Sequence, residues 1–347
     1  MLHHILVPLD GSDLADRALP VAGSIARQTG AQVHLVAVHQ PLATSMLSMG
    51  MAIEVLNAYG ELDRQNREEL AAHVGGRMLD LTAHYHVTTH EMLLEGPGTV
   101  VDQLAAYAES HEIDLVVMTT HGRGALGRFL MGSVADAVLR TIGRPCLLLR
   151  TAPVERPEGA PVDLAAAPPV AFERVLVPLD GTAEAEQAVE AALDLAAPAT
   201  AELTLLQIVV PLLWFAPAAP FRGYEFDHGF VGEREQEAKA YLERVATGLR
   251  SRGLRVRCLT GIDTSPGAAI LDLLEHERFD LLAMAARQRH GADRLLLGSV
   301  MDKVVRHAHA PVLVARLPAT APAGATEAAA TAMHESSSLV RSPCATS

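Results

Sequence analysis

Apolar positions along this chain follow two patterns, short runs of branched residues and longer segments in which apolar residues recur at helical spacing. The run at 4–9 predicts a buried strand, because a strand covered on both faces is apolar at successive positions. The segment between Ser12 and Gly30 predicts a helix, with Ser12 or Asp13 as its N-cap. The pattern further predicts strands at 33–38, 89–94, 114–119 and 146–149, and helices at 61–84, 99–111 and 133–142. Strands that alternate with helices imply right-handed crossovers and a parallel sheet.

The chain contains this pattern twice. Residues 5–12 read ILVPLDGS and residues 175–182 read VLVPLDGT, so six of these eight positions are identical. Residues 114–133 align with residues 280–299 without a gap. A unit of this length indicates a duplicated domain and not an array of short repeats.

The repeat defines the expected domain organisation. We expect one domain at 1–151, a Pro/Ala-rich linker at 152–172, a second domain at 173–317 and a disordered tail at 318–347. Each domain is expected to be an α/β unit, a Rossmann-like open parallel five-stranded sheet flanked by helices. In such sheets ligands bind beyond the carboxyl ends of the strands, at the point where the strand order reverses.

The composition of the chain indicates which kinds of partner it can bind and in which cellular compartment it resides. The formal net charge of −13 repels a polyanion, so binding of nucleic acid is not expected. The three cysteines are far apart and lack metal-site spacing, which favours a reducing compartment. The sequence has no apolar run of the roughly 18 residues that a membrane span needs, and its first residues do not resemble a signal peptide. We therefore expect a cytoplasmic protein that does not bind membranes and has no metal site formed by its own side chains.

The segment after the fourth strand carries the strongest candidate chemistry. Its glycines allow backbone N–H groups to approach an anion, and Gly132-Ser133 opens the next helix, whose N-terminus favours phosphate. Arg123 and Arg128 supply positive charge for charge-assisted hydrogen bonds. The segment therefore predicts a polyphosphate-binding loop.

These motifs resemble the universal stress protein family. Its nucleotide-binding members carry a glycine, two residues, a second glycine, nine residues, and then Gly-Ser or Gly-Thr. Gly122 and Gly132-Ser133 fit this spacing, and Thr119 stands where the family has its first glycine. The family's first strand ends in Pro-x-Asp, matched by Pro8-Leu9-Asp10. The resemblance implies an adenine-nucleotide α-hydrolase-like fold, with the adenosine of ATP near Asp10 and Val38.

The resemblance and the loop together define a predicted site for ATP, which could carry Mg²⁺; AMP and cyclic AMP fit the same pattern. The predicted site comprises Pro8, Asp10, Val38, Thr119, His121, Gly122, Arg123, Gly124, Arg128, Gly132, Ser133 and Val134. In the second copy Ala285 and Gln288 replace the two early glycines. A degenerate second site, with weaker or no nucleotide binding, would retain Asp180, Arg289, Gly298 and Ser299.

The same residues could also have purely structural roles. Asp10 and Asp180 also suit the role of holding the turn after each first strand, and Ser133 suits a simple N-cap. The glycines at 122–127 spell GxGxxG, but they follow the fourth strand, which disfavours a dinucleotide site. The histidines at 84, 86 and 90 predict a solvated connector.

Three functions compete on this basis. The first is a nucleotide-binding stress-response or signalling module without fast turnover, with at most slow ATP hydrolysis. The second is an enzyme, but the chain lacks the SGGxDS, HIGH and GxxxxGK[ST] motifs that such enzymes use. The third is a ligand-free scaffold in which the apolar last strands, at 146–149 and 312–315, pair within one chain, after which a homodimer could also form. The motifs favour the first.

Overall fold

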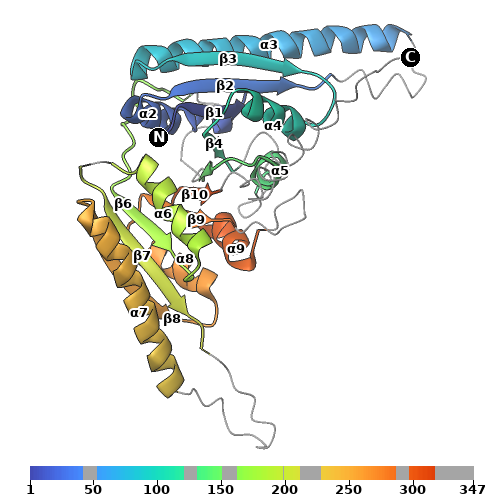
Figure 1. The fold of residues 1–347 in the computed structure, drawn as a ribbon. Helices are drawn as coiled ribbons and strands as arrows, with labels where there is room; N and C mark the ends of the chain where they lie inside the picture. The colour runs from blue at the N-terminus through green and yellow to red at the C-terminus, as the bar shows by residue number, and fades with distance from the viewer. Residues whose placement is uncertain are drawn as a thin grey trace, which may run out of the picture. The chain divides into compact units, whose positions relative to one another are not determined.

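The computed structural model describes residues 1–41, 53–120, 131–150, 162–197, 199–211, 228–286 and 297–316. Met1–Arg316 form one compact unit in which both copies repeat the same order of elements (Figure 1). None of the described helices is long and apolar enough to cross a membrane.

The first half contains the elements β1 (His4–Leu9), α1 (Asp13–Asp16), α2 (Leu19–Thr29), β2 (Gln32–His39), α3 (Ile53–Tyr85), β3 (Thr89–Glu95), α4 (Val100–Ser110), β4 (Leu115–Thr119), α5 (Ser133–Thr141) and β5 (Cys146–Leu149). The second half contains β6 (Arg174–Pro178), α6 (Ala183–Leu195), β7 (Glu202–Val209), α7 (His228–Ser251), β8 (Arg255–Ile262), α8 (Pro266–His276), β9 (Leu281–Ala285), α9 (Ser299–His307) and β10 (Val312–Ala315).

One sheet of ten strands runs through both halves, in the order β3-β2-β1-β4-β5-β10-β9-β6-β7-β8. The strands are parallel within each half, and the two halves join where β5 pairs antiparallel with β10. In this joint Leu147 lies opposite Leu313. The predicted α/β fold and the predicted pairing of the last strands within one chain are confirmed. The two five-stranded sheets are therefore halves of one continuous sheet.

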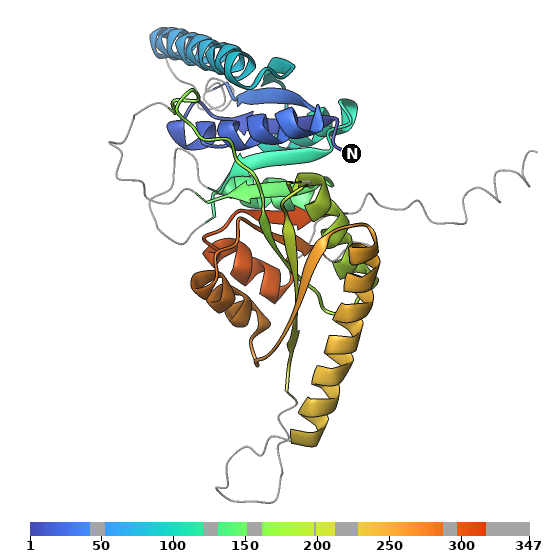
Figure 2. The same cartoon turned by 90° about the vertical axis from the view of Figure 1, so that its left-hand side faces the viewer.

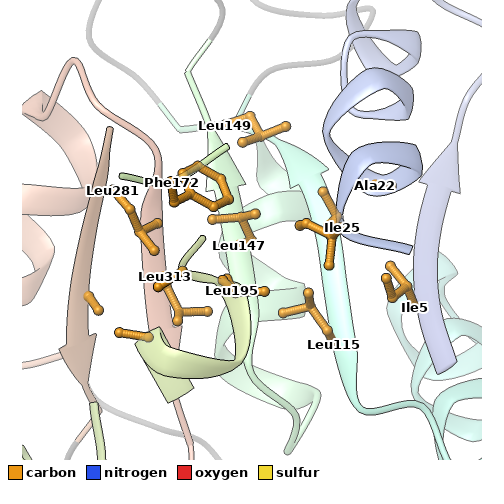
Figure 3. Packing of buried hydrophobic residues seen from close by; sticks show 14 of the residues in the cluster. Ile5, Ala22, Ile25, Leu115, Leu147, Leu149, Phe172, Leu195, Leu281 and Leu313 are labelled. Atoms are coloured by element: carbon orange, nitrogen blue, oxygen red, sulfur yellow. The ribbon is translucent and has the colours of Figure 1, made fainter. Parts of the chain in front are cut away.

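Helices cover both faces of each half's sheet (Figures 1 and 2). Helices α2, α3, α6 and α7 pack on one face, and α4, α5, α8 and α9 pack on the other. Successive strand residues point to opposite faces, so Ile5 and Val7 belong to one core cluster and Leu6 to the other. Figure 3 shows the first cluster passing from Ile5 through Leu147 to Leu313 across the joint. Burial on both faces explains why these strands are apolar throughout.

Two predicted elements differ from the structure. Helix α3 begins at Ile53, eight residues before the predicted start at position 61. The predicted helix after Ser12 is two helices, because α1 ends at Asp16 and α2 begins at Leu19 with a proline in its first turn. The predicted caps hold, since Ser12 Oγ accepts from the Ala15 N–H and Gly30 adopts a left-handed conformation with φ of 78°.

The end of the expected linker is packed against the unit. Leu164 and Phe172 are buried, and Phe172 forms an isolated bridge with Ala196. The Val170 N–H also donates to Ser24 Oγ at 2.9 Å. Linker-like composition did not predict this, because two apolar residues are enough to anchor a proline-rich segment on a core. Residues 151–161 lie outside the described part of the chain.

Each half also caps a helix of the other half. Arg316, just after β10, donates to the carbonyl oxygens of Leu139 and Ile142 at the end of α5. Arg150, at the matching position after β5, donates to the carbonyl oxygens of Arg306 and Ala308 at the end of α9. Helix C-termini leave carbonyl groups without helical partners, and a guanidinium satisfies them. The joint therefore fixes the ends of α5 and α9 that lie away from the candidate site.

Candidate functional site

The strand order reverses direction in the first half between β1 and β4. The chain passes from β1 to β2 and β3 on one side, and returns to β4 and β5 on the other side of β1. In open α/β sheets, the crossovers on either side of such a point leave a crevice at the carboxyl ends of the strands, and ligands bind there. Pro8, Asp10, Val38 and Thr119 all lie at this edge, on or just after the ends of β1, β2 and β4 (Figure 1).

Asp10 organises the turn that follows β1. Its Oδ1 accepts hydrogen bonds from the Ser12 N–H at 3.0 Å and from Ser12 Oγ at 2.5 Å. Gly11, between them, has a φ of 76°, which favours glycine. The second half repeats this geometry, because Asp180 Oδ1 accepts from the N–H and Oγ1 of Thr182. Both aspartates therefore hold a turn, whatever else they bind.

The N-terminus of α5 faces the same edge. Its N-cap is Gly132, with φ of −60° and ψ of 147°, and no side chain caps the helix. Ser133 is therefore the first helical residue and not the N-cap, which corrects one structural reading of this serine. The Gly132 N–H donates to the Thr120 carbonyl at 2.7 Å, which ties the helix start to the end of β4. The first N–H groups of a helix lack helical acceptors and attract anions.

Exposure differs among the predicted residues. Ser133 and Val134 are exposed, Gly132 is half-buried and Thr119 is buried at the end of β4. Five of the predicted residues, His121, Gly122, Arg123, Gly124 and Arg128, lie outside the described residues, as does Arg289 of the second half. The structure thus brings together Pro8, Asp10, Val38, Thr119, Gly132, Ser133 and Val134 at one edge.

The described residues of the second half enclose a cavity of about 640 Å³ at the equivalent edge. The ends of β6, β7 and β9 and the starts of α8 and α9 line it. Three of the four residues predicted for a degenerate second site, Asp180, Gly298 and Ser299, contribute to its walls.

Gln207, near the end of β7, also lines this cavity, and the motif analysis did not identify it. Its Oε1 is buried and has no hydrogen-bond partner among the described residues. An unpaired buried acceptor costs about 1–3 kcal/mol. The matching position in the first half is Ala37, as the offset of 170 between Val7 and Val177 gives. The replacement of an apolar residue in one copy by a polar residue in the other is the sequence signal that would have found it.

No group of three or more His, Cys, Asp or Glu side chains in the described ranges is arranged to hold a metal ion. Ser133 and Val134 are exposed residues in the first turn of α5, where backbone N–H groups lack acceptors within the helix.

The described elements define a class of protein. It has two tandem α/β halves, each with a candidate small-molecule binding site at the carboxyl ends of its strands. The model of the universal stress protein family matches residues 1–150 and 171–316. The chain therefore belongs to the universal stress protein family, in its tandem two-domain form.

Individual relatives agree with this assignment. A universal stress protein of Methanocaldococcus jannaschii is 28% identical over 155 residues, which cover 42% of this chain and 84% of that protein. A universal stress protein of Mycolicibacterium smegmatis is 26% identical over 315 residues, covering 90% of this chain and 96% of that protein. A crystal structure of a universal stress protein from Archaeoglobus fulgidus superposes with a TM-score of 0.61 at 18% identity, covering 90% of this chain and 98% of that one. This last likeness concerns the fold alone.

Proposed function

We propose that the first half of this chain binds ATP between the carboxyl ends of β1 and β4, and that the protein acts as a stress-response or signalling module without fast turnover. The observation that carries the proposal is the open first turn of α5 beside the end of β4, at the reversal point of the strand order. In this arrangement the phosphates lie on the 121–130 loop and the α5 N-terminus, and the adenosine lies near Asp10 and Val38.

Recognition of phosphate by this acidic chain requires positive groups at the site itself. The chain as a whole is acidic, with a formal net charge of −13, so the site must supply its own positive potential. A helix N-terminus contributes about 0.3–1 kcal/mol, whereas micromolar affinity requires about 8 kcal/mol. Arg123, Arg128 and contacts with the base would have to provide most of the remainder.

Two measurements test this proposal. Mass spectrometry of nucleotide retained through a gentle purification, followed by calorimetric titration with ATP, is expected to give about one equivalent per chain. Gly132→Val is expected to lower ATP affinity about tenfold or more, because a branched side chain would occupy the space for phosphate.

Gly298→Val is the matched control, since Gly298 is the N-cap of α9 in the second half and a Cβ there meets nothing within 4 Å. It should leave the affinity of the first half for ATP unchanged. Unchanged affinity in Gly132→Val would overturn the placement, and loss only in Gly298→Val would move the site to the second half.

A ligand-free scaffold is the second candidate. The turns of Asp10 and Asp180 have the same hydrogen bonds in both halves, although the glycine loops differ, which suits a structural role. Absence of retained nucleotide and of titration heat would favour the scaffold. Because β5 and β10 pair with each other, a homodimer formed by strand pairing would use the outer strands β3 or β8 of the described sheet.

A further inference from the structure

Three histidines surround His34 at the amino ends of the strands in the first half, at the opposite end of the sheet from the proposed ATP site. Together these residues form the histidine cluster: His4, His34, His90 and His111. We propose that this cluster is an acid-sensitive switch, which holds the last turn of α4 and the start of β3 on the sheet at neutral pH and releases them in mild acid. The inference does not depend on the ATP proposal, because the two sites lie at opposite ends of the strands.

His34 of β2 is the centre of the cluster and is 4% exposed. Its Nε2 lies 3.0 Å from Nδ1 of His4, and its Nδ1 lies 2.9 Å from the Tyr107 hydroxyl. The facing nitrogens of His4 and His34 form a hydrogen bond only while one of them lacks a proton, because two protonated rings present two donors. The link between these rings therefore exists only while the pair carries no more than one positive charge.

The groups that face His34 disfavour a proton on its ring. The titratable groups around it are the rings of His4 from β1, His90 from β3, and Tyr107 and His111 from the end of α4. Burial, and then the neighbouring imidazoles, lower the pKa of His34 to about 4. Asp114 lies at the same edge, but its Oδ2 accepts from the backbone N–H groups of His3 and His4 at 2.6 and 3.0 Å. Between pH 6.5 and 4 a proton on His34 is therefore favoured only after its surroundings have opened to water.

The second half has permanent charges at the matching positions. The register of its strands and the C-cap of α8 place four residues where the first half has its histidine cluster: Arg174, Thr204, Arg257 and Glu277. Arg257 donates to both carboxylate oxygens of Glu277, at 2.7 and 3.1 Å, and lowers the pKa of that carboxyl group. This ion pair joins β8 to the end of α8, and it stays charged in the pH range in which histidines take up protons. Mild acid should therefore open this edge in the first half only.

Hydrogen exchange of the full chain, followed by mass spectrometry at pH 7, 5.5 and 4.5, tests the switch. Rates are corrected for the intrinsic pH dependence of exchange. Residues 89–92 and 107–111 are then expected to exchange roughly fiftyfold faster at pH 4.5 than at pH 7, the factor that linkage gives when the pKa of His34 rises from about 4 to 6.5 on opening. The matching residues of the second half, 256–259 and 273–277, should change little.

Three variants assign the effect to the cluster. His34→Gln removes the buried ring and should abolish most of the increase, whether or not the variant is also less stable at pH 7. His111→Gln removes one neighbouring imidazole at an exposed position, leaves the buried centre intact and should reduce the increase. His84→Gln, at an exposed position in the last turn of α3 outside the cluster, is the matched control and should behave as the parent.

Three outcomes would overturn the proposal. Absence of the increase in the parent would show that this edge does not open in mild acid. An equal increase in both halves would show acid unfolding of the whole unit instead of a local switch. An increase of parental size in both His34→Gln and His111→Gln would show that the histidine cluster does not cause the effect. Failure of the ATP proposal would appear only in the titrations of Gly132→Val and its parent, and would leave these exchange rates unchanged.

Discussion

Three histidines, His4 of β1, His90 of β3 and the α4 C-cap His111, surround His34 of β2 in the first half. His34 Nε2 lies 3.0 Å from His4 Nδ1, and His34 Nδ1 lies 2.9 Å from the Tyr107 hydroxyl. The rings of His90 and His111 lie 4.8 and 5.8 Å from the ring of His34. Burial, and then the neighbouring imidazoles, lower the pKa of His34 to about 4. The neutral form of His34 therefore predominates in the folded protein above about pH 4.

This arrangement predicts a loss of stability in mild acid. In the unfolded chain His34 binds a proton below pH 6.5, whereas in the folded protein it stays neutral down to about pH 4. Unfolding therefore takes up a proton between these values, and the free energy of unfolding falls as the pH drops from 6.5 to 4. The loss from His34 is on the order of 3 kcal/mol.

Urea unfolding at pH 7, 5.5 and 4.5 would measure this loss. Carboxylates also contribute to acid lability, so the comparison is with His34→Gln, in which the contribution of His34 is absent. The parent should lose more stability than the variant between pH 7 and 4.5. Parallel curves for the two proteins would show that His34 does not carry the effect.

The histidine cluster also shows which residue contacts the sequence alone does not predict. Sequence proximity singled out positions 84, 86 and 90, and predicted a solvated connector. All three histidines are exposed, in keeping with that prediction, but His90 also bonds Gln32 and contacts His34, a residue of the neighbouring strand. Contacts across strands depend on register, which a single sequence does not specify. The Ser12 cap and the left-handed Gly30 were predictable because their partners are local.

Among the elements, α3 differed most from its prediction. Residues 59–70 of this helix are exposed on most sides, with Leu62 46% exposed, so no apolar stripe marks this stretch. Arg64 instead forms ion pairs with Glu61 and Glu68, three and four residues away. The strands were predictable because burial on both faces makes them continuous apolar runs.

One buried ion pair anchors α3 to α1. The Asp16 side chain is fully buried, and it bonds His73 Nε2 at 2.9 Å and Arg77 Nε at 2.8 Å. Asp16→Ala would leave Arg77, which is 13% exposed, without this partner. We expect a loss of about 3 kcal/mol, because removing one member of a buried pair leaves an uncompensated charge.

Asp80→Ala is the matched control, since Asp80 contacts the same arginine at 3.3 Å but is 51% exposed. It should cost less than about 1 kcal/mol. Chemical denaturation of both variants would measure the difference. Equal losses would mean that burial of Asp16 does not decide the strength of this anchor.

For the molecule as a whole, the sequence predicted the joint but not its polar contacts. The apolar last strands indicated pairing, since an unpaired apolar edge invites it. The arginine caps had no sequence signal, because Arg150 and Arg316 simply follow a strand. Asp136 and Arg306, and likewise Asp302 and Arg140, also approach across the joint at 3.8 and 3.9 Å. The same positions in both copies supply these contacts, as expected from a duplicated domain whose copies pair with each other.

The two arginine caps should differ in strength. Arg316 is 8% exposed and donates to two carbonyl oxygens of α5 through both terminal nitrogens, whereas Arg150 is half-buried and donates to carbonyl oxygens of α9 through Nη1. Burial lowers the pKa of Arg316, which shows that its charge is costly to hold there. Arg316→Ala would lose both bonds and leave a cavity, so we expect a loss of about 3 kcal/mol, against about 1 kcal/mol for Arg150→Ala.

The variant Arg316→Met distinguishes two contributions of Arg316 to stability, its hydrogen bonds to the end of α5 and the packing of its side chain. Methionine fills much of the volume without a charge to desolvate, so it should recover part of the loss if packing dominates. If the α5 carbonyl groups need the cap, Arg316→Met will be nearly as unstable as Arg316→Ala in thermal or urea unfolding. Equal losses for Arg316→Ala and Arg150→Ala would contradict the asymmetry. Because α5 begins at the candidate phosphate site and ends at this cap, the same variants would also show in ATP titration whether the second half stabilises the binding edge of the first.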